Sequence, residues 1–240
     1  MALAQAEMTE AALRAAHPEL EVERRIIKTT GDRRTDVPLA EVASAEGHLD
    51  KGVFIKELEV ALAAGEIDLA VHSLKDVPSE LEAGFALAAV LERAPVGDVL
   101  VTKGPGGLAA LGEGATVATS SVRRKRMLLS GRGDLEVVDI RGNVPTRLRK
   151  LAEQDELDGL ILAEAGLVRL GLLAEGRVKS GEVELHAETL DADWFYPAAG
   201  QGAVALEVRD DDERTAEICG AINHQSTEAA VTAEREFLVL

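Results

Sequence analysis

Short apolar runs alternate with longer helical segments through most of this 240-residue chain. The apolar runs predict strands at residues 68–73, 98–102, 115–119, 136–140, 157–163 and 203–208. Helical spacing predicts helices at residues 3–16, 53–64, 120–129, 145–154, around Leu167, 211–222 and 226–240. Strands that alternate with helices are typical of an α/β protein with a mostly parallel sheet. We therefore expect an α/β fold.

Three stretches depart from this alternation. Residues 20–29 are β-prone, residues 30–51 form a polar loop with few apolar anchors, and residues 173–192 show no regular pattern. We expect a polar loop of this length to be mobile.

The composition limits the class of protein. Hydrophobic residues make up 46% of the chain, which suits a globular core, and no apolar run approaches the ~20 residues that cross a bilayer. The first residues lack the basic and apolar regions of a signal peptide. We therefore expect a soluble cytoplasmic protein that does not bind membranes, and we expect it to be a monomer. Cys219 is the only cysteine, which excludes an intrachain disulfide and a cysteine zinc cluster.

Charge is distributed unevenly. The net charge of −17 argues against nucleic acid as a partner, because nucleic-acid binding needs a broad basic surface. Residues 119–150 nevertheless hold nine basic and only three acidic side chains. Such a basic segment in an acidic protein indicates either a site for a small anion or a solvated helix face, and charge alone does not separate the two.

Two predicted strands end in turns with polar side chains. Residues 73–78 place Asp76 beside Lys75 directly after a strand, which suits proton transfer or stabilisation of a cation, although an ordinary turn explains the pair as well. Residues 119–121 offer hydroxyl groups as helix N-caps, followed by Arg123 and Arg124. Arginines in a first helical turn oppose the helix dipole, so they favour an anion bound at that end.

Two further turns follow the same logic. Residues 139–147 contain a Gly turn, Asn143 as the expected N-cap, Pro145 early in the helix, and Arg141 and Arg147 on either side. Residues 163–169 end in Arg169, where a plain helix start is an equal explanation. The histidines show no metal-ligand spacing, His72 fits a core position, and there is no phosphate-binding glycine motif.

These segments together resemble the porphobilinogen deaminase family. The matching strings, in the family's order, are KGVFIKELE (51–59), AVHSLKDVP (70–78), TSSVRR (119–124), RGNVPTR (141–147), LAEAGL (162–167), PAAGQGA (197–203) and TAER (232–235). The resemblance implies two domains like those of type II periplasmic binding proteins, with a cleft between them, and a small third α/β domain. By position, domain 1 comprises residues 1–91 and 200–220, domain 2 comprises residues 97–187, and residues 222–240 begin domain 3.

The resemblance also implies an activity. Family members are hydroxymethylbilane synthases, which join four porphobilinogen molecules head to tail through oligopyrrole intermediates, with loss of ammonia, on a dipyrromethane cofactor. By the same resemblance, Asp76 is catalytic and handles the pyrrole N–H protons. The residues implied to bind acetate and propionate groups are Arg123, Arg124, Arg141, Arg147 and Arg169. Further hydrogen bonds would come from Ser73, Lys75, Thr119, Ser120 and Ser121, and Lys51 and Gln201 would line the cleft.

The sequence departs from the family pattern at three places. It starts after the family's first strand, it ends before the loop that carries the cofactor cysteine, and residues 43–50 lack the usual Gly-Gly before Lys51. Cys219 lies on a predicted helix upstream of that loop and is interpreted as a small buried residue. Three alternatives follow: a fragment of a working enzyme, a shortened paralogue that binds pyrrole carboxylates or other small anions, or a cysteine-free variant. We expect the chain alone to be poorly active or inactive.

Overall fold

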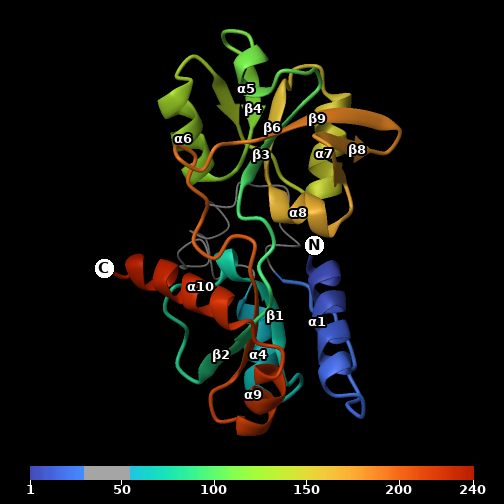
Figure 1. Ribbon diagram of the computed structural model, residues 1–240, viewed down its shortest axis with the longest axis vertical. Coiled ribbons are helices and arrows are strands. Elements are labelled where there is room, and N and C mark those ends of the chain that lie inside the picture. Colours follow the sequence, from blue (N-terminus) through green and yellow to red (C-terminus); the bar gives the residue numbers. More distant parts are fainter. Residues whose placement is uncertain (30–54) are drawn as a thin grey trace. The chain divides into compact units, whose positions relative to one another are not determined.

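The computed structural model describes residues 1–29 and 55–240 (Figure 1). The whole of the predicted 30–51 loop, Lys51 included, lies outside these residues. The chain divides into two compact units. Residues Pro95–Ala198 form the central unit, and Ala2–Ala94 with Ala199–Leu240 form the outer unit; both names refer only to the order along the sequence. The predicted third domain, residues 222–240, lies within the outer unit and stays a prediction.

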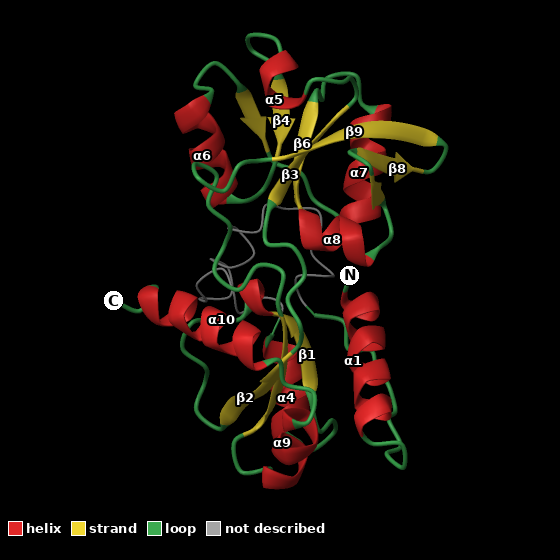
Figure 2. Cartoon of the chain, viewed as in Figure 1, coloured by secondary structure: helices red, strands yellow, loops and turns green. Residues whose placement is uncertain are grey.

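The central unit is built on a seven-stranded sheet (Figure 2). In sheet order its strands are β5 (Glu136–Val138), β4 (Thr116–Ala118), β6 (Gly159–Ala163), β3 (Asp98–Thr102), β9 (Val183–Thr189), β8 (Arg177–Ser180) and β7 (Leu173–Ala174). Only β5, β4 and β6 run parallel to one another, and every other pairing is antiparallel. The expectation of a mostly parallel sheet is therefore wrong.

The reason for this difference lies in the connections. Parallel neighbours need a crossover segment, which α6 (Val122–Gly131) and α7 (Val144–Glu153) supply. Residues 173–189, predicted as irregular, instead form hairpins with short turns. In the turn between β7 and β8, Glu175 and Gly176 both have positive φ, 48° and 71°, which matches the twist of a two-residue hairpin.

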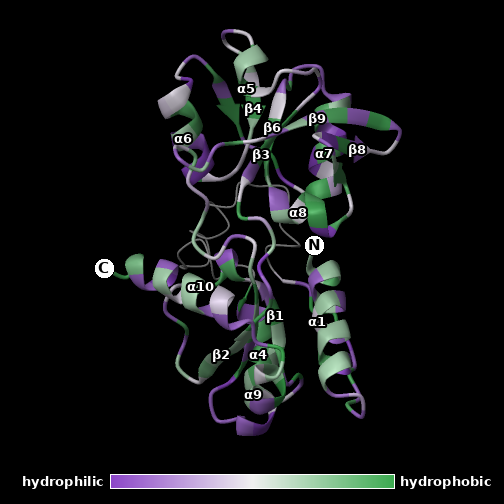
Figure 3. Cartoon of the chain, viewed as in Figure 1, coloured by the Kyte–Doolittle hydropathy of each residue, from purple (hydrophilic) through white to green (hydrophobic). Residues whose placement is uncertain are grey.

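Helices cover both faces of the central sheet. On one face, Val99, Val101 and Leu160 pack with Leu148 and Leu151 of α7, and Leu167 of α8 (Glu164–Arg169) joins them. On the other face, Leu100 and Ile161 pack with Leu128 of α6 and Leu108 of α5 (Gly107–Ala110). This alternation along buried strands explains their continuous apolar sequence, and the strands carry much of the hydrophobic colouring (Figure 3).

The outer unit has a three-stranded antiparallel sheet. Its order is β1 (Ala70–Ser73), β10 (Val204–Arg209) and β2 (Phe85–Val90). Leu206 and Val208 face Cys219 of α9 (Glu213–Gly220) on one side. Ala205 on the other side belongs to a core with Ile55, which precedes α4 (Lys56–Ala63), and Val231 of α10 (Gln225–Phe237).

The N-terminal segment is partly as predicted. The helix expected at residues 3–16 is α1 (Ala2–Ala16). The β-prone residues 20–29 form no strand, so that prediction is wrong. A strand needs a partner edge, whereas here Arg24 pairs with Glu7 and Glu10 of α1, and Arg25 pairs with Glu66.

Candidate functional site

Three of the four predicted polar turns meet at one edge of the central sheet. Because β5, β4 and β6 are adjacent and parallel, their carboxyl ends lie at the same edge. The turns that follow them begin at Thr119, Asp139 and Glu164. Ligands of open α/β sheets bind beyond such strand ends. The fourth turn follows β1 and belongs to the outer unit.

The turn after β4 is held by its own hydroxyl groups. Ser121 is the N-cap of α6, as predicted, and its Oγ accepts a hydrogen bond from the Arg124 amide at 3.4 Å. Ser120 Oγ donates to the Ile140 carbonyl at 2.7 Å and accepts from the Ile140 amide at 3.1 Å. Thr119 is buried, and its Oγ1 accepts from the Ser121 amide. These hydroxyl groups therefore fix the turn.

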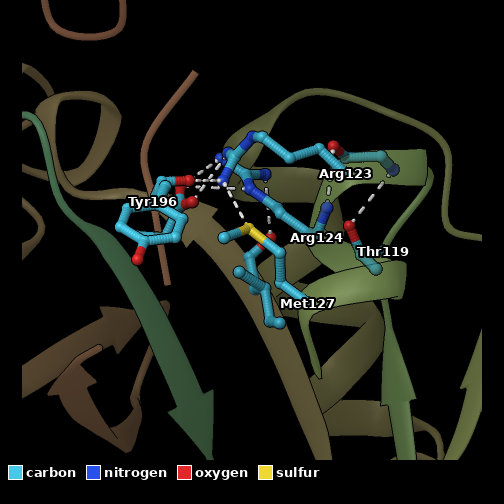
Figure 4. Close-up of polar contacts among 8 residues, drawn as sticks. Thr119, Arg123, Arg124, Met127 and Tyr196 are labelled. Carbon is cyan, nitrogen blue, oxygen red and sulfur yellow. Dashed lines mark hydrogen bonds and ion pairs between the residues drawn. The ribbon is translucent and has the colours of Figure 1, made fainter. Parts of the chain in front are cut away.

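Arg123 and Arg124 share one buried carboxylate, that of Asp98. Figure 4 shows the two arginines side by side with their polar contacts. Asp98, the first residue of β3, is fully buried and accepts from Arg124 Nη2 at 2.7 Å, Arg124 Nε at 3.1 Å and Arg123 Nη2 at 2.7 Å. Arg124 also donates to the Ile161 carbonyl, and Arg123 to the Tyr196 carbonyl. Both guanidinium groups are thus held in fixed orientations.

Asp98 supplies the anion that the sequence predicts near the start of α6. Burial alone would raise the pKa of its carboxyl, but the charges and hydrogen bonds of Arg124 and Arg123 outweigh burial and hold the pKa below its usual range. Asp98 reaches this edge because β3 runs antiparallel to β6, which places Asp98 opposite Ala163. An anion is therefore present beside the first turn of α6, and it is the carboxylate of Asp98.

The turn after β5 has the predicted capping. Asn143 Oδ1 accepts from the Thr146 amide at 2.9 Å, and Pro145 lies in the first turn of α7. Gly142 has φ of 115°, and a Cβ there would lie 2.8 Å from Thr146 Cγ2, so only glycine fits. Arg147 Nε donates to the Gly142 carbonyl at 2.6 Å, which orients this arginine toward the same turn.

Arg141 and Arg169 are both half-buried beside these turns. In each, Nε is buried and makes no hydrogen bond within the described residues, although each residue has other interactions. Burial lowers the pKa of the Arg169 guanidinium from its usual value.

The turn after β1 fixes its backbone and exposes its carboxylate. Residues Leu74–Asp76 form a 3-10 helix in which Leu74 is buried, and the next residue, Val77, is buried too. Asp76 between them is exposed, and Lys75 is half-buried. Ser73 Oγ lies 2.7 Å from the Gln5 Nε2 that donates to it. Asp76 is therefore presented to solvent from a rigid support.

Two predicted site residues remain, Gln201 and Lys51. Gln201 is fully buried, and its backbone carbonyl oxygen accepts a hydrogen bond from Arg93 Nε at 2.9 Å. Lys51 lies outside the described residues.

Sequence reasoning missed two residues that support these turns, Asp98 in the central unit and Arg93 in the outer unit. Asp98 carried a usable signal, because it is a lone acid at the start of an apolar run. Arg93 carried none, since its partners Gln201 and Glu234 lie more than 100 residues away.

Cys219 does not fit a covalent attachment. It is fully buried against Leu206 and Val208, and burial, with a smaller effect of Asp212, raises the pKa of its thiol to about 11. Because the thiolate is the nucleophile, a thiol in this environment is a poor nucleophile. The position of Cys219 on α9 confirms the prediction of a small buried helix residue. The arginines fit the acidic side chains of a dipyrromethane, whereas this thiol does not fit its linkage.

Among the described residues, no helix is long and apolar enough for a membrane span.

Two α/β units with polar turns at strand ends give this chain a fold like that of type II periplasmic binding proteins. The VFT2 domain of BvgS from Bordetella pertussis, solved as a double mutant, matches with a TM-score of 0.52 at 17% identity over 96% of this chain and 83% of that one. The methionine-binding protein MetQ matches with a TM-score of 0.52 at 14% identity over 98% of this chain and 91% of that one. At these identities the likeness concerns the fold alone.

Sequence relatives define the family. A family model described as "Porphobilinogen deaminase, dipyromethane cofactor binding domain" matches residues 1–217. A porphobilinogen deaminase of Syntrophomonas wolfei is 46% identical over 238 residues, which are 99% of this chain and 72% of that protein. A porphobilinogen deaminase of Rubrobacter xylanophilus is 48% identical over 238 residues, which are 99% of this chain and 72% of that protein. The chain belongs to the porphobilinogen deaminase family of transferases in tetrapyrrole biosynthesis.

Proposed function

We propose that this chain has the hydroxymethylbilane synthase activity of its family, at the low level expected for the chain alone, with the residues of the strand-end turns in the roles given below. The observation that carries the proposal is the family relationship, which extends over 99% of the chain at 46% identity. In the reaction, porphobilinogen loses ammonia to give an electrophilic azafulvene. The free α-carbon of a terminal pyrrole attacks its methylene carbon, a C–C bond forms, and the attacking α-carbon then loses its proton, which restores the aromatic pyrrole.

We assign the proton and charge chemistry to Asp76. Its exposed carboxylate stands on a backbone held by buried Leu74 and Val77, so it can meet a substrate without first becoming ordered. A carboxylate there accepts hydrogen bonds from pyrrole N–H groups and stabilises the cation that forms as ammonia leaves. Ser73 and Lys75 on the same turn would add hydrogen bonds.

We assign the substrate acetate and propionate groups to arginines of the central unit. Arg141, Arg147 and Arg169 accompany the turns after β5 and β6, and guanidinium groups bind carboxylates in bidentate fashion. Arg123 can add a contact, since it is only half-buried. Arg124 is buried and donates to Asp98 and Ile161, so we assign it to the support of Arg123. Thr119, Ser120 and Ser121 support the same turn.

The test measures turnover of porphobilinogen by the purified protein, with ammonia release and formation of the linear tetrapyrrole. We expect D76N to lower kcat by roughly 100-fold or more, the usual scale of acid–base and charge stabilisation. D155N, at an exposed position of the central unit, is the matched control. Normal turnover by D76N would contradict the role of Asp76. Porphobilinogen binding without turnover by the unaltered protein would contradict the synthase activity and favour a binding protein.

We also expect a cytoplasmic monomer that does not bind nucleic acid. The net charge of −17 supports the last point. Light scattering after size-exclusion chromatography gives the molar mass, and a mass of two chains would contradict the monomer.

A further inference from the structure

The TAER string at residues 232–235 has no role in the site described above, although it contains two adjacent charged residues on α10. Glu234 and Arg235 point to different turns of the outer unit. One of these turns carries Asp76, and the other carries Gly200 and Gln201.

Arg235 binds the backbone directly after Asp76. Its Nη2 donates to the carbonyl oxygens of Pro78 at 2.6 Å and Ser79 at 2.9 Å, and its Nη1 donates to that of Val77 at 3.4 Å. Three consecutive carbonyl groups therefore converge on one guanidinium. A planar group with five N–H donors can satisfy all three, and a lysine ammonium cannot reproduce that geometry.

Glu234 holds the neighbouring turn, which carries Gly200. It forms a bidentate pair with Arg93 at 2.6 and 2.8 Å and accepts from the Gly200 amide at 2.8 Å. Gly200 in turn lies against the Asp76 turn, because a Cβ there would come within 2.9 Å of Leu74 Cγ and 3.2 Å of the Lys75 amide nitrogen. Arg235 thus holds the backbone of residues 77–79 directly, and Glu234 supports residues 74–75 through Gly200.

We infer that Glu234 and Arg235 are positioning residues, which set the backbone of residues 74–79 and through it the carboxylate of Asp76. The effect on turnover rests on the proposed function, whereas the effect on the turn itself does not. A purely structural role in docking α10 would lower overall stability without a selective effect on this turn.

The experiment compares R235K and E234Q with the unaltered full chain by hydrogen exchange and by steady-state kinetics. The controls are R214K and E217Q on α9, both at exposed positions. The amide of Val77, which donates to the Leu74 carbonyl at 3.1 Å, reports on the turn. We expect its exchange to rise about tenfold in R235K and to rise in E234Q, because each loses charged hydrogen bonds to this region.

Kinetics then test the consequence for Asp76. We expect kcat to fall by roughly 10- to 100-fold in R235K, with KM within about twofold, because displacement of a catalytic group acts mainly on the chemical step. Unchanged exchange of Val77 in both variants overturns the inference. So does faster exchange with unchanged kcat. If the unaltered protein does not turn over porphobilinogen, the proposed function fails, and the exchange measurement still decides the role of the two residues in the turn.

Discussion

Asp98 is a fully buried acid of the central unit, and two arginines depend on it for their hydrogen bonds. Its carboxylate is removed from water and is satisfied by two arginines that are adjacent in the sequence. Removing one partner of such a buried ion pair leaves uncompensated charge, which costs more than the pair itself contributes. The geometry of Arg123 and Arg124 therefore depends on this one acid.

We expect D98N to lower the free energy of unfolding by about 3 kcal/mol near neutral pH. The arginines hold the folded-state pKa of Asp98 below the unfolded value of 3.8, so this stability is fully present above that value. The contribution of Asp98 to the free energy of unfolding is lost as the pH falls below 3.8 and through the folded-state pKa. The difference in this free energy between D98N and the unaltered protein should therefore shrink in that range. Urea denaturation at several pH values measures it. D155N is the control, and equal midpoints for D98N and the unaltered protein at neutral pH would contradict the assignment.

Cys219 is expected to be unreactive in the folded protein. Its thiol is buried and has a pKa of about 11, so almost no thiolate exists near neutral pH. A thiol reagent should label native protein slowly and denatured protein at once, and the intact mass should show no group on this residue. Rapid native labelling, or a pyrrole adduct mapped to Cys219, would show that the thiol is accessible.

Two helices of the central unit begin by the same device. Ser121 caps α6 and Asn143 caps α7, each accepting from the amide three residues later. Each cap lies in the turn between a strand and the next helix, so it helps to fix the angle at which the arginine-bearing helix leaves the sheet. The caps therefore connect local sequence to the placement of the candidate site.

We expect N143A to destabilise the protein by about 1 kcal/mol, because the first amides of α7 lose their acceptor. N143S keeps a capping oxygen and should stay within a few tenths of a kcal/mol of the unaltered protein. Urea denaturation midpoints of the three proteins give the comparison. If serine proves as costly as alanine, the loss arises from something other than capping.

As a whole, the molecule is two units with separate cores. The central unit is one continuous segment, residues 95–198, and both hydrophobic clusters on its sheet are formed from within that segment. The outer unit is assembled from two separated segments, since β10 pairs with β1 and β2. Continuity and self-contained packing are the properties of a segment that can fold alone.

We expect a protein of residues 95–198 alone to unfold cooperatively in urea and to keep the Asp98 ion pairs. Circular dichroism and NMR dispersion report the fold. D98N in this shorter protein should lower its stability by about the same amount as in the full chain, because the pair lies inside the unit. A non-cooperative transition would mean that the central unit depends on the rest of the chain.

Local sequence was enough for the features that depend on neighbours in the chain. The positions of β3, β4 and β6, the caps Ser121 and Asn143, and the inert position of Cys219 follow from apolar runs, capping preferences and helix spacing. Each of these depends on residues a few positions apart. The family strings extended this to the two-unit fold and to the class of reaction.

Pairing between distant segments required the folded structure. No local signal shows that β3 runs antiparallel to β6, yet that register places Asp98 against Arg123 and Arg124 and gives both of these expected ligand-binding residues an ion-pair partner within the chain. The β-prone residues 20–29 form no strand, and Arg235 binds carbonyl groups more than 150 residues away. Register, burial and contacts of this kind depend on how the cores pack, because a side chain meets a distant partner only after both of their supporting elements have been placed.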